Sequence, residues 1–286
     1  MILPTGARKF DRMRVPLSLF CLTMLAAAPA QAQYPGGGTS GRATGETYRV
    51  EIGGYIWNPA PEIIVRSEAL TQARLGSTID FEQDFGIEKK RFNQIKVVLR
   101  PATKHKFRFE YTPITYEAPN ATLRRTIVFN GQEFNLALPV SASLEWKAYR
   151  FGYEWDMIYR DRGFFGILLE AKYTDVQATL AQNALGLEEF ARARAPIPAI
   201  GAIARVYVVP NISISGEISG FKLPESIDEE YRAHYIDFDL YGSVNFTDHF
   251  GAQVGYRSID VFYFIDDEDE GKLKLKGLYF GGVVRF

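Results

Sequence analysis

Apolar and polar side chains alternate with a period of two along most of the chain beyond residue 90. In the clearest example, Tyr149, Phe151, Tyr153 and Trp155 alternate with Arg150, Gly152, Glu154 and Asp156. This alternation predicts β-strands that have one apolar and one polar face. Similar stretches begin at Thr47, Phe92, Phe107, Phe165, Ile200, Ile212, Ile236, Ala252 and Leu278. The pattern predicts about ten strands, with eight or twelve as alternatives because residues 62–90 and 121–138 can each be interpreted differently.

Short turns and longer connections separate the predicted strands in alternation. The short turns fall near residues 102, 161, 210 and 248, and the longer connections cover residues 58–90, 117–142, 181–195, 222–230 and 265–271. Within them, Pro59 and Pro61 are expected to end the first strand, Asn130-Gly131 predicts a hairpin and residues 184–191 predict a helical turn. An even number of strands, with short turns at one end and long loops at the other, is typical of transmembrane β-barrels.

Alternation alone does not say which face of such a barrel points outward. A soluble, lipocalin-like barrel would turn its apolar faces inward, and a membrane barrel would turn them outward. Several predicted strands reach ten residues or more, near the roughly 9–11 residues that cross a bilayer when tilted. Aromatic residues make up 14% of the chain while mean hydropathy is only −0.13. These features favour the outward arrangement, and the expected fold is all-β, a closed antiparallel up-and-down transmembrane β-barrel.

The first 32 residues have the features of a secretory signal peptide. Four basic residues, Arg8, Lys9, Arg12 and Arg14, precede an apolar run from Val15 to Ala28, and Ala30-Gln31-Ala32 fits a cleavage site. A membrane anchor is the alternative, but the run is shorter than the roughly 20 residues that a spanning helix needs. Residues 33–46 are glycine-rich and predict a flexible lead-in, so the barrel domain is expected at 47–286. The net charge of −1 leaves no basic field for nucleic acid.

The C-terminal stretch ends on an aromatic residue, with Gly281, Val284 and Phe286 on the last predicted strand. This arrangement resembles the C-terminal assembly signal of bacterial outer-membrane β-barrels. The chain from Thr47 to Phe286 resembles the small outer-membrane barrels of the OmpA and OmpW kind. The resemblance implies the cell outer membrane as location, outer-membrane lipid and the β-barrel assembly machinery as partners, and no cofactor. It covers no subfamily motif, so it implies no functional residues.

The polar faces of the predicted strands carry equal numbers of acidic and basic residues. The basic ones are Arg49, Lys96, Arg100, Arg108, Arg150, Lys172, Arg205 and Arg257, and the acidic ones are Glu51, Glu110, Glu154, Asp156, Glu170, Glu217, Asp237 and Asp239. If these faces point inward, opposite charges are expected to pair across the lumen, because a barrel of about ten strands has little room inside. The alternative is a selective polar pore.

Few residues suggest catalysis or metal binding. His105 and His249 lie beside short turns, whereas His234 lies close in sequence to Asp237, a combination that a lipid-modifying enzyme or protease could use. The acidic run at 266–270 lacks the regular ligand spacing of a calcium site, so no metal is expected. The sequence therefore predicts a non-enzymatic outer-membrane barrel with a structural or surface-interaction role through its extracellular loops. A narrow channel or porin for ions or small solutes is the alternative, an enzyme is the third candidate, and the surface partner or solute stays unknown.

Overall fold

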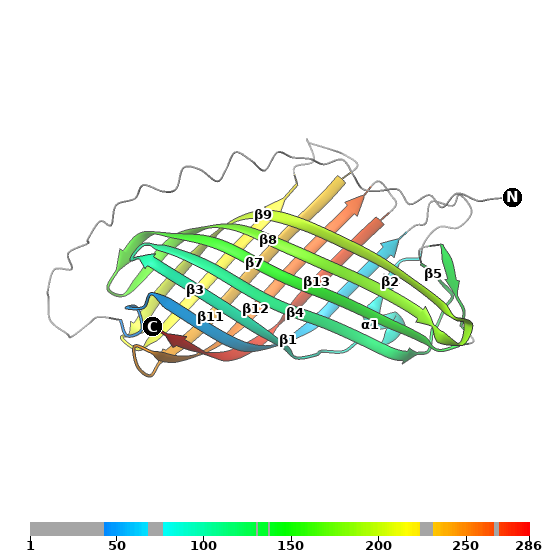
Figure 1. Ribbon diagram of the computed structural model, residues 1–286, viewed down its shortest axis with the longest axis horizontal. Coiled ribbons are helices and arrows are strands. Elements are labelled where there is room, and N and C mark those ends of the chain that lie inside the picture. The colour runs from blue at the N-terminus through cyan, green and yellow to red at the C-terminus, as the bar shows by residue number, and fades with distance from the viewer. Residues whose placement is uncertain (1–42, 68–76, 130, 137, 224–230, 266–268) are drawn as a thin grey trace. The chain divides into compact units, whose positions relative to one another are not determined.

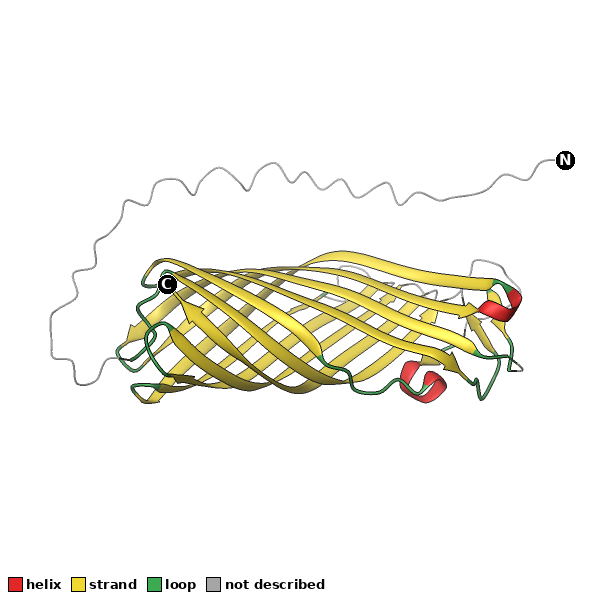
Figure 2. Ribbon diagram, turned by 60° about the horizontal axis from the view of Figure 1, so that its bottom comes forward, coloured by secondary structure: helices red, strands yellow, loops and turns green. Residues whose placement is uncertain are grey.

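Ten strands close into one antiparallel barrel in the computed structural model, which describes residues 43–67, 77–129, 131–136, 138–223, 231–265 and 269–286 (Figure 1, Figure 2). The barrel strands are β1 (Val50–Ser67), β3 (Phe92–Ala102), β4 (His105–Ala121), β7 (Val140–Arg160), β8 (Gly163–Gln182), β9 (Leu187–Val209), β10 (Ile212–Lys222), β11 (Tyr231–Asn245), β12 (Phe250–Ile265) and β13 (Asp269–Arg285). Each strand pairs with its neighbours in chain order, and β13 also pairs with β1, which closes the sheet. The predicted fold class is confirmed.

The two ends of the barrel differ in the length of their connections. At one end, the turn end, residues 103–104, 161–162, 210–211 and 246–249 join consecutive strands, as predicted. The opposite, loop end carries the short strand β2 (Ile79–Asp80), the helix α1 (Phe81–Phe85) and a hairpin of β5 (Ile127–Phe129) and β6 (Gln132–Phe134). The predicted hairpin is confirmed by this pairing, and Gly131 at its turn has a φ of 77°, which glycine adopts without strain.

In the half of the barrel nearer the turn end, apolar side chains face outward and polar ones face inward. Phe107, Phe151 and Leu278 are 48%, 51% and 66% exposed on the outer surface, whereas Arg108 and Arg150 on the same strands are buried. The soluble alternative, with apolar faces inward, does not describe this half. The outward assignment of the apolar faces is therefore confirmed here.

In the half nearer the loop end, the same strands reverse this arrangement. On β7, Val140, Leu144 and Trp146 point inward and are buried, while Glu145 and Lys147 point outward and are exposed. The change falls at one level of the barrel on adjacent strands, just beyond three outward tyrosines, Tyr111, Tyr149 and Tyr173, which we call the tyrosine girdle. The chain thus forms a barrel with an inverted, membrane-type half and a conventional half with an apolar core.

The first strand is longer than the sequence predicts, because it continues through Pro59 and Pro61 to Ser67. Val50 and Phe286 exchange both backbone hydrogen bonds, so alternate residues of β1, including both prolines, direct their backbone nitrogens away from β13. On that other side, the pairing with β3 ends at Trp57. Each proline therefore lacks only a hydrogen-bond donor that would have had no strand partner, which is where a strand tolerates proline.

The prediction of a loop with a helical turn between residues 181 and 195 is wrong. β8 continues to Gln182, a single 3-10 turn covers Asn183–Leu185, and β9 begins at Leu187. The ladder between the two strands runs from Gly163↔Val206 to Gln182↔Leu187. This cross-strand pairing outweighs the local helix preference of the Ala-, Leu- and Glu-rich sequence.

The connection predicted at 117–142 was also too long, because β4 continues to Ala121 and β7 already begins at Val140. The predicted signal peptide at 1–32, the first part of the lead-in and residues 266–268 of the acidic run lie outside the described residues. Within the described part of the chain, no helix is long and apolar enough to span a membrane.

Candidate functional site in the barrel lumen

The inward faces of the turn half hold a network of buried ion pairs. Of the charges expected there, all are buried except Lys96, which is partly exposed, and Arg49, which is exposed. The expectation for Arg49 is corrected, because this residue precedes β1 and its side chain points away from the lumen. Buried charges are costly unless they are paired, so the contacts of each one matter.

Glu217 on β10 is a centre of this network. Its Oε1 accepts hydrogen bonds from Arg108 Nη2 at 2.5 Å and from the Tyr241 hydroxyl at 2.9 Å. Lys96 Nζ lies 3.3 Å from the same oxygen, and Arg150 Nη2 lies 3.4 Å from Oε2. Three cations from three other strands thus converge on one carboxylate, which ties distant walls of the barrel together.

A second group crosses the lumen around Asp237 on β11. Arg257 Nε and Nη2 donate to the two carboxylate oxygens of Asp237 at 3.1 and 2.8 Å, and Arg257 Nη1 also pairs with Glu110 on β4. Lys172 Nζ donates to Asp237 at 2.9 Å and lies 3.4 Å from Glu170. The Arg257–Glu110 and Lys172–Asp237 pairs join strands that share no backbone ladder, so side chains bridge the lumen at this level.

The network continues toward the turn end through residues that the sequence analysis did not include. Lys106 Nζ lies 2.5 Å from Glu154 and 2.9 Å from Asp156, and Arg285 Nε donates to Glu51 at 2.6 Å. Lys106 directly precedes the predicted strand at Phe107, and Arg285 is the penultimate residue. Extending the alternation by one position before Phe107 would have found Lys106, and Arg285 already lies on the last predicted strand, between Val284 and Phe286.

Glu46, from the predicted lead-in, lies inside the turn-end mouth of the barrel. Its side chain accepts hydrogen bonds from Arg205 Nη1 at 2.9 Å and from the Tyr207 hydroxyl at 2.7 Å, and Arg100 Nη1 lies 3.4 Å from Oε2. Burial acts to raise the pKa of Glu46, but the charges of Arg205, Lys106 and Arg100 outweigh it and lower the pKa below its ordinary value.

Backbone contacts hold the same segment, residues 43–46, across the mouth. The Thr44 amide donates to Pro210 O at 2.7 Å, and the Gly45 amide donates to the Asp248 carboxylate at 2.8 Å. Asn245 Nδ2 in turn donates to Thr44 O at 2.6 Å. These residues are therefore part of the barrel end, which corrects the boundary of the lead-in predicted at residue 46.

The loop half is filled by an apolar core instead of charges. Inward residues of β1, β4, β7 and β8 pack with α1 and with the β5–β6 hairpin, and Trp57, Phe81, Phe134 and Trp146 are almost fully buried there. We call α1, β2 and the β5–β6 hairpin with the segment that joins it to β4 the cap. Arg125 stabilises this cap, because its Nε and Nη2 bind the two Asp84 oxygens at 3.0 and 2.7 Å. Asp84 also accepts a hydrogen bond from the Asp80 amide at 3.0 Å, so α1 and β2 are attached to the segment after β4.

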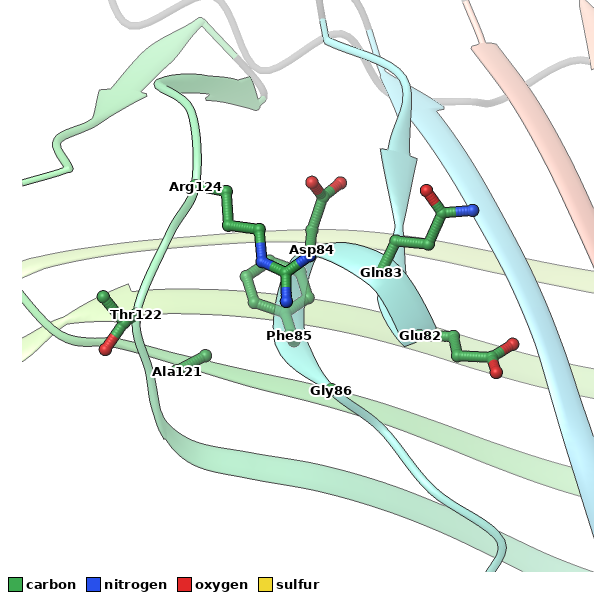
Figure 3. A pocket seen from close by; sticks show the side chains of 8 residues that line it. All are labelled: Glu82, Gln83, Asp84, Phe85, Gly86, Ala121, Thr122 and Arg124. Atoms are coloured by element: carbon green, nitrogen blue, oxygen red, sulfur yellow. The ribbon is translucent and has the colours of Figure 1, made fainter.

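A polar cleft of about 670 Å³ lies on the surface of this cap. Figure 3 shows it between α1 and the segment that follows β4, with Glu82 and Gln83 on one side and Thr122 and Arg124 on the other. The cleft is open to solvent, and its lining combines two acidic side chains with one arginine. It offers no nucleophile paired with a base.

The three histidines take no part in the ion pairs of the lumen, although His249 Nδ1 lies 3.0 Å from the backbone oxygen of Arg285. His234 points to the outer surface, where it stacks on Phe262 and lies 3.5 Å from Asp260, whereas Asp237 points into the lumen. The structure therefore does not bring together the His234–Asp237 pair considered from the sequence. His105 is the first residue of β4, and its Nδ1 lies 2.6 Å from the Tyr153 hydroxyl. No group of three or more potential ligands suited to a metal ion occurs among the described residues.

Comparison with known proteins identifies the fold but no relative in sequence. No protein-family model matches the chain, and no curated protein matches it. The outer-membrane protease OmpT of Escherichia coli superposes with a TM-score of 0.53 and 7% identity over 83% of this chain and 96% of that chain. Two weaker matches are Ail, the attachment invasion locus protein of Yersinia pestis, and the toluene transporter TodX of Pseudomonas putida. Ail has a TM-score of 0.37 at 11% identity, and TodX has 0.34 at 7%; each covers 83% of this chain, with 99% and 90% of their own lengths.

The match to OmpT, the closed ten-strand barrel and the outward apolar faces agree on one class of protein. The chain has the fold of the small bacterial outer-membrane β-barrels. At 7% identity the likeness to OmpT concerns the fold alone, and a shared fold does not decide an activity.

Proposed function

We propose that this protein is a non-enzymatic outer-membrane barrel whose lumen is closed and whose role lies in surface interaction at the loop end. The observation that carries the proposal is the double filling of the lumen. Ion pairs bridge the turn half, and an apolar core fills the loop half. A continuous water path would need both fillings to be displaced. The sixteen sequence-predicted charges, apart from Arg49, act in this proposal as structural elements.

The loop end supplies the surface for such an interaction. Beyond the tyrosine girdle, the hairpin of β8 and β9 ends in the turn Asn183–Leu185, where Leu185 is 61% exposed and Phe190 is 56% exposed. Gln182 Nε2 donates to Asn135 O at 2.9 Å, so this tip is attached to the segment after β6, where Leu136 is also exposed. Apolar side chains held outward on a supported tip are typical of contact sites.

Conductance across a planar lipid bilayer tests the proposal. The folded full chain is expected to add no stable conductance steps at neutral pH. The matched variant Glu46→Gln, which removes one buried charge at the turn end, is expected to stay closed as well, because the apolar core of the loop half is unchanged. Stable conductance of the unmodified protein would refute the closed lumen and establish the alternative, a channel for ions or small solutes.

The enzyme hypothesis has less support. His234 and its neighbour Asp260 lie on the outer wall and not in a cleft, so a substrate would have no enclosed site there. The expected result is that the folded protein neither cleaves peptides nor modifies outer-membrane lipid. An activity that disappears in the His234→Ala variant would contradict this part of the proposal.

A further inference from the structure

A row of charged side chains lies on the outer surface directly beyond the tyrosine girdle. The cross-strand register places Lys147 of β7 beside Asp175 of β8, and Asp175 beside Arg194 of β9. Arg192 lies one outward position farther toward the loop end and binds Asp175 with two hydrogen bonds, at 2.8 and 2.6 Å. Two arginines thus bind the Asp175 carboxylate, and the register places a third cation, Lys147, beside Asp175 on the neighbouring strand.

The two arginines of this row remain accessible although they are paired with Asp175. The side chain of Asp175 is only 15% exposed, whereas those of Arg192 and Arg194 are 37% and 52% exposed. Arg194 approaches the carboxylate less closely, with Nε at 3.3 Å. Glu145 is the second acidic neighbour, so the three cations leave a net charge of +1 against two carboxylates. A further anion is therefore electrostatically favoured.

The strand arrangement leaves the arginines open on one side. β9 pairs with β10 only as far as Ile200, so within the described strands Arg194 has a ladder neighbour on the β8 side alone. On the side toward the turn end, the row meets the tyrosine girdle, in which Tyr111 and Tyr149 stack at 4.7 Å and Tyr149 lies 6.2 Å from Tyr173. Aromatic rings in such a band mark the level of lipid headgroups.

The level of the row agrees with the dimensions of a bilayer. From Tyr149 to Ile158, the outward residues of β7 are apolar or aromatic. At about 3.3 Å per residue and a tilt of about 40°, this segment spans roughly 23 Å, close to the roughly 25 Å apolar band of a membrane barrel. The row of cations therefore falls at the depth where the phosphates of lipid headgroups lie.

We propose that Lys147, Arg192 and Arg194 form a binding site for the phosphate of a lipid headgroup in the leaflet at the loop end. The guanidinium groups match a phosphate in geometry and charge. The girdle and the apolar belt below it accommodate the lipid body, so the ligand is a phosphorylated lipid and not a free anion. The site rests on the proposed insertion of the barrel into the outer membrane.

Lipid retention by the folded protein tests the site. The full chain is folded into phosphatidylcholine vesicles with or without diphosphoryl lipid A, extracted in mild detergent, and assayed for bound lipid A and for the temperature at which its compact band is lost in SDS electrophoresis. Lipid A is expected to be retained and to raise that temperature. The triple variant Lys147→Ala, Arg192→Ala, Arg194→Ala is expected to retain lipid A on the order of a hundredfold more weakly.

Two matched variants make the result specific. Arg124→Ala removes an exposed cation of the cap, in the segment that follows β4, and is expected to retain lipid A normally. Arg192→Lys with Arg194→Lys keeps the charge but loses the planar fork, so intermediate retention is expected. Equal retention by the triple variant and the unmodified protein would overturn the site.

Two further outcomes would also overturn the proposal. If inorganic phosphate alone raises the unfolding temperature as much as lipid A does, the site binds a free anion and not a lipid. If monophosphoryl and diphosphoryl lipid A are both retained no better than phosphatidylcholine, the row is a salt bridge without a ligand. A protein that folds into no vesicle at all would instead contradict the membrane insertion on which the site rests.

Discussion

Reversing the charge of Arg150 tests most directly whether the lumen network holds the barrel together. Arg150 is buried and lies 2.5 Å from Glu170, 3.4 Å from Glu217, 3.7 Å from Glu110 and 3.9 Å from Asp237. Breaking a buried ion pair by removing one partner costs about 3–5 kcal/mol, because a buried charge is left uncompensated. Arg150→Met is expected to lose roughly this amount.

The variant Arg150→Glu should be affected more severely, since it places a fifth carboxylate among the four that surround Arg150. Its loss of unfolding free energy combines the missing ion pairs with electrostatic repulsion. This loss approaches the total stability of about 5–15 kcal/mol that is typical of folded proteins. We therefore expect Arg150→Glu to give no compact, heat-modifiable band in SDS electrophoresis after folding into vesicles. Arg150→Met should fold but show a lower urea midpoint.

The control is Arg160→Glu, which reverses an exposed charge at the turn end of the same strand. It should unfold close to the urea midpoint of the unmodified protein, because exposed charges contribute little. A second control combines Arg150→Glu with Glu170→Arg, which restores one opposite pair and should recover part of the folded band. If Arg150→Glu folds with an unchanged midpoint, the network does not stabilise the barrel and the reasoning is wrong.

Three further predictions concern the two ends of the barrel. Glu46→Gln should lower the unfolding free energy at pH 7 by roughly 2–4 kcal/mol. The pKa of Glu46 in the folded protein lies below the ordinary 4.5, so the ionised carboxylate stabilises the fold above pH 4.5. The difference in stability between the variant and the unmodified protein should therefore shrink as the pH falls further. Arg125→Ala should detach α1 and speed proteolysis of the loop end, measured against Arg124→Ala, which leaves the Asp84 contact intact; equal cleavage rates would contradict the anchoring role. Phe286→Ala should reduce the folded fraction in cells but leave the urea midpoint of the folded protein nearly unchanged. The midpoint should hold because the side chain is 67% exposed and the backbone makes the contacts to β1. Normal assembly of this variant would contradict the predicted assembly signal.

The alternation of apolar and polar residues was sufficient to predict the strands of the turn half. Around Phe151 and Phe165, one face is uniformly apolar and the other carries charges, and such a pattern has a single interpretation. The pattern no longer predicted strands where the apolar residues move from the outward to the inward positions. Beyond Trp57 on β1 and before Tyr149 on β7, inward residues change from polar to apolar. A strand that crosses this level therefore has no single apolar face along its whole length.

Most residues of the candidate site were predictable because the strands that carry them were predictable, whereas Glu46 was not. The side chains of Glu110 and Glu217 could be assigned to the lumen because strand geometry fixes the direction of every second residue. Glu46 lies before the first strand, and its place in the turn-end mouth depends on contacts with Arg205 and Tyr207, more than 150 positions away. No local pattern encodes such a contact.

The reversal of phase at the tyrosine girdle sets how deep the barrel can lie in a bilayer. A shift of one outward position along a tilted strand moves the barrel by about 5 Å along the membrane normal. Toward the hydrocarbon, this shift would submerge Lys147 on β7 and Lys276 on β13; in the opposite direction, it would lift Tyr149 and Leu278 into water. Residues on both sides of the barrel oppose each displacement, so in a bilayer the loop half is held at a constant height above the membrane.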